Sequence, residues 1–185
     1  TCALPIWDDP RLPTLVGARR RGFTPEGFRM FAERIGVSKS DSWIDMSVLE
    51  DCMREHLNEA AERRVAVLDP LKLTITNWPT DADGRPVVEY MELANNPENP
   101  GDGVRDVPFT GELFIERDDF AEVPPPKFFR LSPGKEVRLR GGYFVTATDV
   151  VTDADGRVVE VRATYDPQSR GGSTPDGRKV KATLH

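Results

Sequence analysis

The sequence predicts a segregated α+β fold, with an N-terminal three-helix subdomain followed by an antiparallel β-barrel. Two observations lead to this prediction. Apolar residues recur with helical spacing up to about residue 62, and they alternate with polar residues from residue 63 onward. The second part also contains many short runs rich in Val, Thr and Phe, separated by turn residues and uninterrupted by helical patterns.

Capping residues define the first two helices. Thr14 is a suitable N-cap for a short helix that runs through Arg21. The string Thr24-Pro25-Glu26 combines a cap, a proline at the first helical position and an acid in the first turn. Gly36 follows the last apolar residue of this second helix and is expected to end it.

A third helix is expected to start between Asp45 and Ser47. Ser47 and Glu50 have the spacing of a capping box. His56 shares the apolar face of this helix with Met53, so we interpret it as a packed or half-buried residue and not as a catalyst.

Strand patterns fill the rest of the chain. The predicted strand regions lie within residues 64–77, 86–91, 107–116, 128–131, 136–151, 157–165 and 179–184. The hexamer Thr-Asp-Ala-Asp-Gly-Arg occurs at residues 80–85 and again at 152–157. Because Asp-Gly favours tight turns between strands, we interpret both copies as the turns of two hairpins.

The bulk composition excludes several classes of protein. A formal net charge of −6 argues against a sequence-blind nucleic-acid binder, because such proteins carry a strong basic excess. RNA binding would require the basic residues to gather on one face. The two cysteines, Cys2 and Cys52, form no metal-ligand spacing and no disulfide framework, which favours a reducing cytoplasm. The sequence shows neither a secretory signal nor a membrane-spanning run.

Residues for catalysis are not apparent. The chain has two histidines, His56 and His185, and it contains no glycine-rich phosphate loop, zinc-ligand spacing or nucleophile elbow. We therefore predict no catalytic residue, no metal site and no cofactor for this chain.

One basic cluster is typical of RNA-binding strands. On a strand over residues 135–143, Arg138 and Arg140 would lie together on the open face, opposite the apolar residues. Aromatic residues occur nearby in sequence, at Phe128, Phe129 and Tyr143. Guanidinium planes and aromatic rings are the groups that grip unstacked bases. The alternative interpretation, solvated surface charge, stays open for each cluster taken alone.

Several strings resemble, in order and in register, the segment after the KMSKS loop of class I glutaminyl-tRNA synthetases. They occupy residues 7–14, 19–24, 57–63, 66–72, 107–112, 134–140 and 176–181. The Trp-Asp-Asp-Pro-Arg string at 7–11 is shared with archaeal and eukaryotic glutamyl-tRNA synthetases, whereas residues 58–72 favour the glutaminyl family.

The resemblance implies a division of the chain and a set of RNA-contacting residues. Residues 1–6 would be a non-native leader, 7–62 a helical connective subdomain, and 63–185 most of the proximal anticodon-binding barrel, truncated at its C-terminus. The implied anticodon contacts are Arg63 for the middle base, Arg130 for the third and Arg140 for the first. Arg138 is added to this set from the strand pattern, which places it on the same face as Arg140. Lys39 would lie near the inner elbow of the tRNA.

The resemblance also implies partners and cofactors. The partner would be a glutamine tRNA, bound by a monomer in the cytoplasm, with no role for DNA or a membrane. ATP and Mg would serve the full-length enzyme, whose HIGH and KMSKS motifs lie upstream, so this portion is expected to be inactive alone. The alternatives are a barrel-type glutamyl-tRNA synthetase, a free-standing barrel that binds ribosomal RNA, and an interaction domain whose arginines bind no tRNA.

Overall fold

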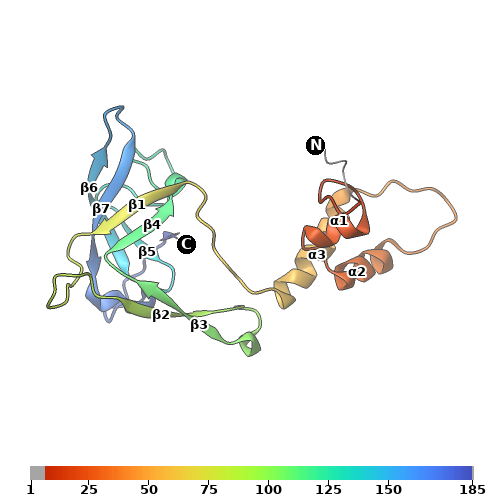
Figure 1. The fold of residues 1–185 in the computed structure, drawn as a ribbon, viewed down its shortest axis with the longest axis horizontal. Helices are drawn as coiled ribbons and strands as arrows, with labels where there is room; N and C mark the ends of the chain where they lie inside the picture. Colours follow the sequence, from red (N-terminus) through yellow and green to blue (C-terminus); the bar gives the residue numbers. More distant parts are fainter. Residues whose placement is uncertain (1–6, 185) are drawn as a thin grey trace. The chain divides into compact units, whose positions relative to one another are not determined.

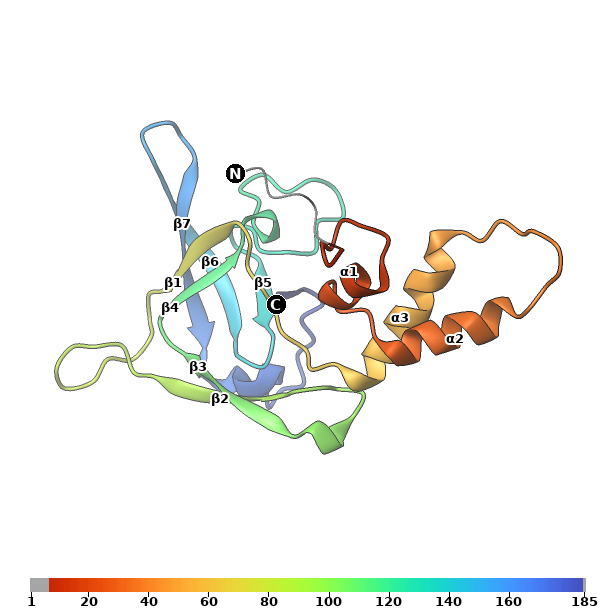
Figure 2. The same cartoon turned by 45° about the vertical axis from the view of Figure 1, so that its right-hand side comes forward.

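A computed structural model describes residues 7–184 of the chain. The expected leader, residues 1–6, and His185 lie outside the described residues. The chain forms two compact units, drawn in Figures 1 and 2. The helical unit contains the chain up to Arg63 together with Asn96–Asp102, and the barrel unit contains Arg64–Asn95 and the chain from Gly103 onward.

Side-chain caps fix the helices of the helical unit. These helices are α1 (Leu15–Arg20), α2 (Pro25–Ile35) and α3 (Met46–Ala60). The hydroxyls of Thr14 and Thr24 accept hydrogen bonds from backbone amides of α1 and α2, as predicted, and Gly36 ends α2. The prediction that Ser47 caps α3 is wrong, because the carboxylate of Asp45 accepts the Ser47 amide at 2.8 Å. Two N-cap candidates stood close together, and the one farther upstream makes the bond.

The helical unit has a small interior where α2 meets α3. Cys52 is fully buried and Met53 is 3% exposed. Gly27 lies so close to the Met53 thioether that a β-carbon at this position would collide with it. His56 is half-buried, as expected, and its Nδ1 lies 2.9 Å from the Thr24 hydroxyl, which links the start of α2 to α3.

Two sheets make up the barrel unit. The strands are β1 (Pro70–Ile75), β2 (Glu89–Ala94), β3 (Val104–Phe109), β4 (Glu112–Glu116), β5 (Glu136–Leu139), β6 (Phe144–Thr152), β7 (Val158–Asp166) and β8 (Thr183–Leu184). Six of them form a curved, barrel-like sheet in the order β4-β1-β7-β6-β5-β8, and β2 pairs with β3. The overall α+β class is confirmed.

The large sheet is mixed and not antiparallel as predicted. β1 runs parallel to β7, and β5 runs parallel to β8, whereas the other pairs are antiparallel. Alternation of apolar residues indicates a strand but carries no information on the direction of its neighbour. Here the parallel pairs join strands that are far apart in sequence, so their direction depends on long connections.

Several predicted strand regions are shorter or divided. Residues 107–116 contain the end of β3, a bend at Gly111 and β4. Gly111 lies so close to Trp78 that a β-carbon there would collide with it. Residues 136–151 are likewise divided by a turn in which Gly141 has a φ of +71°. Residues 128–131 form no strand, since only Leu131 makes a bridge, to Phe120.

The repeated hexamers form the predicted turns. In each copy the first aspartate, Asp81 or Asp153, accepts amide hydrogen bonds at 2.8–3.0 Å from residues two and four positions later. The glycines, Gly84 and Gly156, have φ values of +76° and +79°, which glycine adopts without steric cost. The second copy joins β6 to β7 in the long hairpin visible in Figure 1.

A single apolar core lies inside the barrel. Leu73, Leu131, Val137 and Val161 are completely buried in it. An aromatic group closes one side of this core and consists of Trp78, Phe109, Tyr143 and Tyr165. In the described part of the chain, no helix is long and apolar enough to cross a membrane.

Tyr143, which is close in sequence to Arg138 and Arg140, belongs to this core and not to an open face. The ring is 4% exposed, and its hydroxyl donates a hydrogen bond of 2.7 Å to the Glu89 carboxylate. Burial, together with that carboxylate, raises the pKa of Tyr143 to about 12. The sequence position of Tyr143 beside basic residues gave no sign that its side chain points inward.

Candidate nucleic-acid interface

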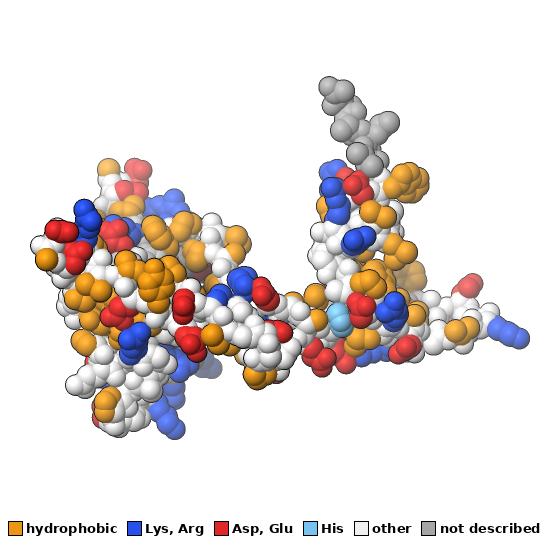
Figure 3. Space-filling model, turned by 60° about the horizontal axis from the view of Figure 1, so that its bottom comes forward, with side chains coloured by type: hydrophobic (Ala, Val, Ile, Leu, Met, Phe, Trp, Pro, Cys, Tyr) orange, Lys and Arg blue, Asp and Glu red, His pale blue; other side chains and the backbone are white. Residues whose placement is uncertain are grey.

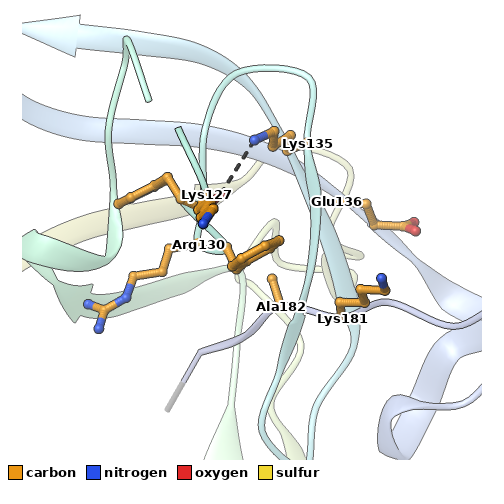
Figure 4. Close-up of a pocket in the computed structure, with 8 residues that line it drawn as sticks. Lys127, Arg130, Lys135, Glu136, Lys181 and Ala182 are labelled. Atoms are coloured by element: carbon orange, nitrogen blue, oxygen red, sulfur yellow. Dashed lines mark hydrogen bonds between the residues drawn. The ribbon is translucent and has the colours of Figure 1, made fainter. Parts of the chain in front are cut away.

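Basic and aromatic residues meet in a hollow on the barrel unit, which we call the Arg130 hollow. Its volume is about 450 Å³. It is lined by Lys127, Phe128, Phe129, Arg130, Lys135, Glu136, Lys181 and Ala182 (Figure 4). Four of these side chains are cationic and one is acidic. The acidic one, Glu136, is already engaged by Arg178 at 3.3 Å, so the hollow is electropositive.

The loop before Arg130 presents an aromatic ring to solvent. Phe129 is 63% exposed, so its ring is accessible to a ligand. Lys127 has a φ of +66°, in the left-handed region, which costs a non-glycine residue roughly 1–2 kcal/mol. Such strain is often found at functional loops, because the surrounding structure must enforce it.

Arg130 is anchored at one end and open at the other. Its Nη1 donates to Asp119 at 2.5 Å and to the Asp118 carbonyl at 3.3 Å. The Asp119 side chain is only 16% exposed, whereas that of Arg130 is 50% exposed. The Asp119 carboxylate therefore holds Nη1 of the guanidinium, while the Arg130 side chain as a whole stays half exposed.

A second basic hollow, which we call the Arg178 hollow, has a volume of about 460 Å³. It is lined by Arg138, Phe144, Gly172, Ser173, Thr174, Gly177, Arg178, Lys179, Val180 and Lys181. Nε and Nη2 of Arg138 both donate to the Thr183 hydroxyl, at 3.2 and 2.9 Å. Lys181 also lines the Arg130 hollow, so the two hollows are adjacent.

Arg140 lines a third hollow, which differs from the other two in being mostly apolar. This Arg140 hollow measures about 360 Å³ and is lined by Arg64, Val65, Leu93, Arg105, Val107, Pro108, Phe109, Leu113, Phe114, Ile115, Leu139, Arg140 and Leu184. Arg105 and Arg64 both donate to the side-chain oxygen of Asn95, at 3.3 and 3.5 Å. Phe114, on its wall, is 61% exposed.

Buried and unburied residues alternate along β5 as predicted, but the two arginines do not line the same hollow. Val137 and Leu139 are buried at 0% and 7% exposure, and the arginines on either side of Leu139 are not buried. Arg138 and Arg140 nevertheless line different hollows, so they do not form one open face. Arg140 lies beyond the last residue of β5, where the chain begins to turn.

Arg63 belongs to the helical unit, where it closes the end of α3. Nη1 donates to the carbonyls of Leu57 and Ala61, and Nη2 donates to the carbonyl of Asn58 at 2.9 Å. The last turn of α3 contains no basic residue of its own. Arg63 therefore supplies both the donors and the positive charge that the end of a helix requires.

Asn96 is a buried polar residue that the sequence did not reveal. It is completely buried in the helical unit, and its amide donates to the carbonyls of Glu59 at 2.8 Å and Asn58 at 3.4 Å. Its side-chain oxygen accepts the Glu98 amide at 3.1 Å. Asn96 and Arg63 thus share the task of satisfying the last carbonyls of α3.

Lys39 lies in the exposed connection between α2 and α3. Its neighbours in that connection include Val37 and Trp43, which are both almost fully exposed. Within residues 7–184, no group of three or more His, Cys, Asp or Glu side chains is placed to hold a metal ion. Lys181, which lines both basic hollows, is not among the RNA-contacting residues expected from the sequence.

Comparison with known proteins gives the family of the chain. The family described as tRNA synthetases class I (E and Q), anti-codon binding domain, matches residues 61–166. A glutamine–tRNA ligase of Rhodopirellula baltica is 59% identical over 179 residues, and those of Bradyrhizobium diazoefficiens and Clostridium kluyveri are 56% and 51% identical. These matches cover 97% of the chain but only 29–31% of the relatives' length. The chain therefore belongs to the class I glutamyl- and glutaminyl-tRNA synthetase family and carries its anticodon-binding domain.

Proposed function

We propose that this chain is the tRNA-binding, anticodon-reading portion of a glutamine–tRNA ligase. The observation that carries the proposal is the Arg130 hollow, which is lined by the exposed Phe129, by the carboxylate-anchored Arg130 and by three lysines. The protein as a whole is acidic, so this local excess of positive charge is a segregated feature. The anticodon-binding family and the glutamine–tRNA ligase relatives support the same assignment.

Physical chemistry explains why such a hollow suits an anticodon. Each anticodon base must leave the stack, which costs a few kcal/mol. Stacking on an aromatic side chain returns about 1–3 kcal/mol per base, and Phe129 offers an exposed ring. Arg130 then offers a planar donor fork, which discriminates among base edges better than the point charge of a lysine.

We assign the anticodon bases to the arginines by their match to the family. Arg130 would read the third base and Arg140 the first. Arg138, proposed from the strand pattern, would contact the anticodon from the neighbouring Arg178 hollow. Arg63 would read the middle base, for which it must exchange at least part of its bonding to the α3 carbonyls. Lys39 would contact the inner elbow of the tRNA.

The whole ligase would join glutamine to its tRNA with ATP and Mg, in the cytoplasm. We propose that the present chain supplies only recognition, as a monomer, and activates no amino acid by itself. It spans about three tenths of the length of the curated relatives, and we assign the catalytic chemistry to the rest of the ligase.

Titration with anticodon stem-loops tests this function. Arg130→Ala and Arg140→Ala should each weaken binding of the glutamine stem-loop by about 1–3 kcal/mol and reduce its advantage over stem-loops with altered anticodons. Arg162→Ala is the matched control, because Arg162 lies on β7 in exposed ion pairs and lines none of the three hollows. Equal affinity of the wild-type chain for all anticodons would contradict base reading. Tighter binding of the glutamate stem-loop would favour a glutamyl-tRNA synthetase.

A further inference from the structure

We propose that the Arg178 hollow is a phosphate-binding subsite that holds the RNA backbone beside the base-reading Arg130 hollow. The proposal rests on the proposed function and adds Lys179 and Lys181 as the residues that bind phosphate. The family resemblance associates three arginines with the anticodon and assigns no role to either lysine.

The cations of this hollow fall into two groups. Arg138 and Arg178 are fixed, since Arg138 donates twice to Thr183 and Arg178 pairs with Asp166 at 2.6 Å and with Glu136. Lys179 and Lys181 are exposed, and their side chains make no hydrogen bond or ion pair with any described residue. The positive charge available to a ligand is therefore concentrated on the two lysines.

The chemistry of the walls favours phosphate over a base. Among the described residues that line the hollow, the one aromatic residue is Phe144, which is 2% exposed and cannot stack on a base. The guanidinium of Arg178 lies over that ring at 5.6 Å, and both arginine forks are occupied. Lysine ammonium groups bind phosphate as mobile point charges without reading base edges.

The local backbone keeps this hollow in shape. Gly172 has a φ of +83°, and a β-carbon there would lie 2.5 Å from Cδ of Arg138. The loop therefore approaches the Arg138 stem as closely as only glycine allows. Gly177 forms a second tight turn, in which its amide donates to the Thr174 carbonyl at 3.0 Å. These two turns set the loop that carries Lys179 against β5.

Adjacency gives the two hollows a joint role. Lys181 lines both of them, so an RNA base in the Arg130 hollow would leave its backbone next to the Arg178 hollow. Phosphate contacts fix the position of a nucleic acid, whereas base contacts specify its sequence. The structure thus separates the two tasks between neighbouring hollows.

The test compares the double variant Lys179→Ala/Lys181→Ala with the wild-type chain across a series of salt concentrations. Affinity for the glutamine anticodon stem-loop should fall roughly tenfold, and by the same factor for stem-loops with altered anticodons. The slope of log affinity against log salt should become shallower by about 1.4, since each phosphate contact to a single strand contributes about 0.7. Lys72→Ala/Arg162→Ala removes the same charge outside the hollows and should leave the slope unchanged.

Two outcomes would overturn the proposal. An unchanged salt slope in the double variant would show that the lysines contact no phosphate. A changed preference among anticodons, as expected for Arg130→Ala, would show that the hollow reads bases. A parallel titration with oligouridylate separates this proposal from the proposed function. If the wild-type chain discriminates among no anticodons, base reading fails, whereas a shallower salt slope of the double variant on oligouridylate still supports the subsite.

Discussion

The barrel unit and the helical unit are each stabilised by a different kind of internal contact. The barrel unit buries a continuous core that includes Leu73 and Val161 at 0% exposure. In the helical unit, the large buried side chains are Cys52 and Met53. The helical unit relies instead on polar contacts of helix ends, such as those made by Asn96 and Arg63.

The helical unit also leaves a larger share of its apolar side chains exposed than the barrel unit does. Exposed apolar side chains occur on both units (Figure 3), but they are a larger share of the shorter helical unit, where Trp7, Leu15 and Trp43 are 79%, 72% and 97% exposed. Hydrophobic burial accounts for most folding free energy, at about 25 cal/mol per Å² of apolar surface. The barrel therefore has a large source of stability of its own, whereas the helical unit depends on a few specific hydrogen bonds.

The largest expected effect comes from the barrel core. Leu73→Ala should lower the free energy of unfolding of the barrel by about 2–5 kcal/mol, because it opens a cavity at a fully buried position. Urea unfolding followed by tryptophan fluorescence measures it, since Trp78 is the buried tryptophan and Trp7 and Trp43 are already exposed. A loss below about 1 kcal/mol would mean that the core is loosely packed.

A smaller, local effect is expected in the helical unit. Asn96→Ala leaves the Glu59 carbonyl without its donor, which should cost about 1–3 kcal/mol. The measurement is thiol labelling of Cys52, which is fully buried and becomes reactive only when the unit opens, in a Cys2→Ser background. Labelling should accelerate while the Trp78 unfolding midpoint stays constant.

Asn99→Ala provides the control for that experiment. Asn99 lies in the same Asn96–Asp102 segment, but its amide donates to Asp102 at the surface. The labelling rate of Cys52 should therefore stay near that of the wild-type chain. Equal acceleration by both variants would show that the segment as a whole, and not the buried amide, stabilises the end of α3.

Helix ends and turns could be predicted from the sequence, whereas the direction of paired strands could not. Helix ends depend on neighbours in the chain, so Thr14, Thr24 and Gly36 predicted the helices well. The direction of β7 beside β1 depends on distant pairing, and the alternating pattern carries no record of it. Turn chemistry is local as well, which is why both hexamers were predicted correctly.

For the candidate site, too, features set by neighbouring residues could be predicted from the sequence, whereas contacts between distant segments could not. The alternation that places Arg138 and Arg140 opposite buried residues is local and was predicted. The walls of the hollows come from segments far apart in sequence, so Lys181 beside Phe129 was not foreseen. Asn96 looked like a loop asparagine, because the carbonyls that it binds lie almost forty positions earlier.

The smallest effect expected is a loss of stability at alkaline pH that should be confined to the barrel. All three tyrosines, Tyr90, Tyr143 and Tyr165, lie in the barrel unit. Burial raises the pKa of Tyr143 to about 12 and also raises that of Tyr165. An unfolded tyrosine loses its proton near pH 10, so above that pH the folded state binds more protons and stability falls as pH rises.

Tyr143 alone should lower barrel stability by about 1 kcal/mol between pH 9 and pH 11. Urea unfolding followed at Trp78 measures this loss, and Tyr143→Phe should remove most of the pH dependence because it has no proton to release. The helical signal in circular dichroism, which comes mainly from α1, α2 and α3, should keep its own urea midpoint over this range. If both signals shift together, the two units unfold as one cooperative structure. In that case the barrel is not stabilised by its own core independently of the hydrogen bonds at the helix ends of the helical unit.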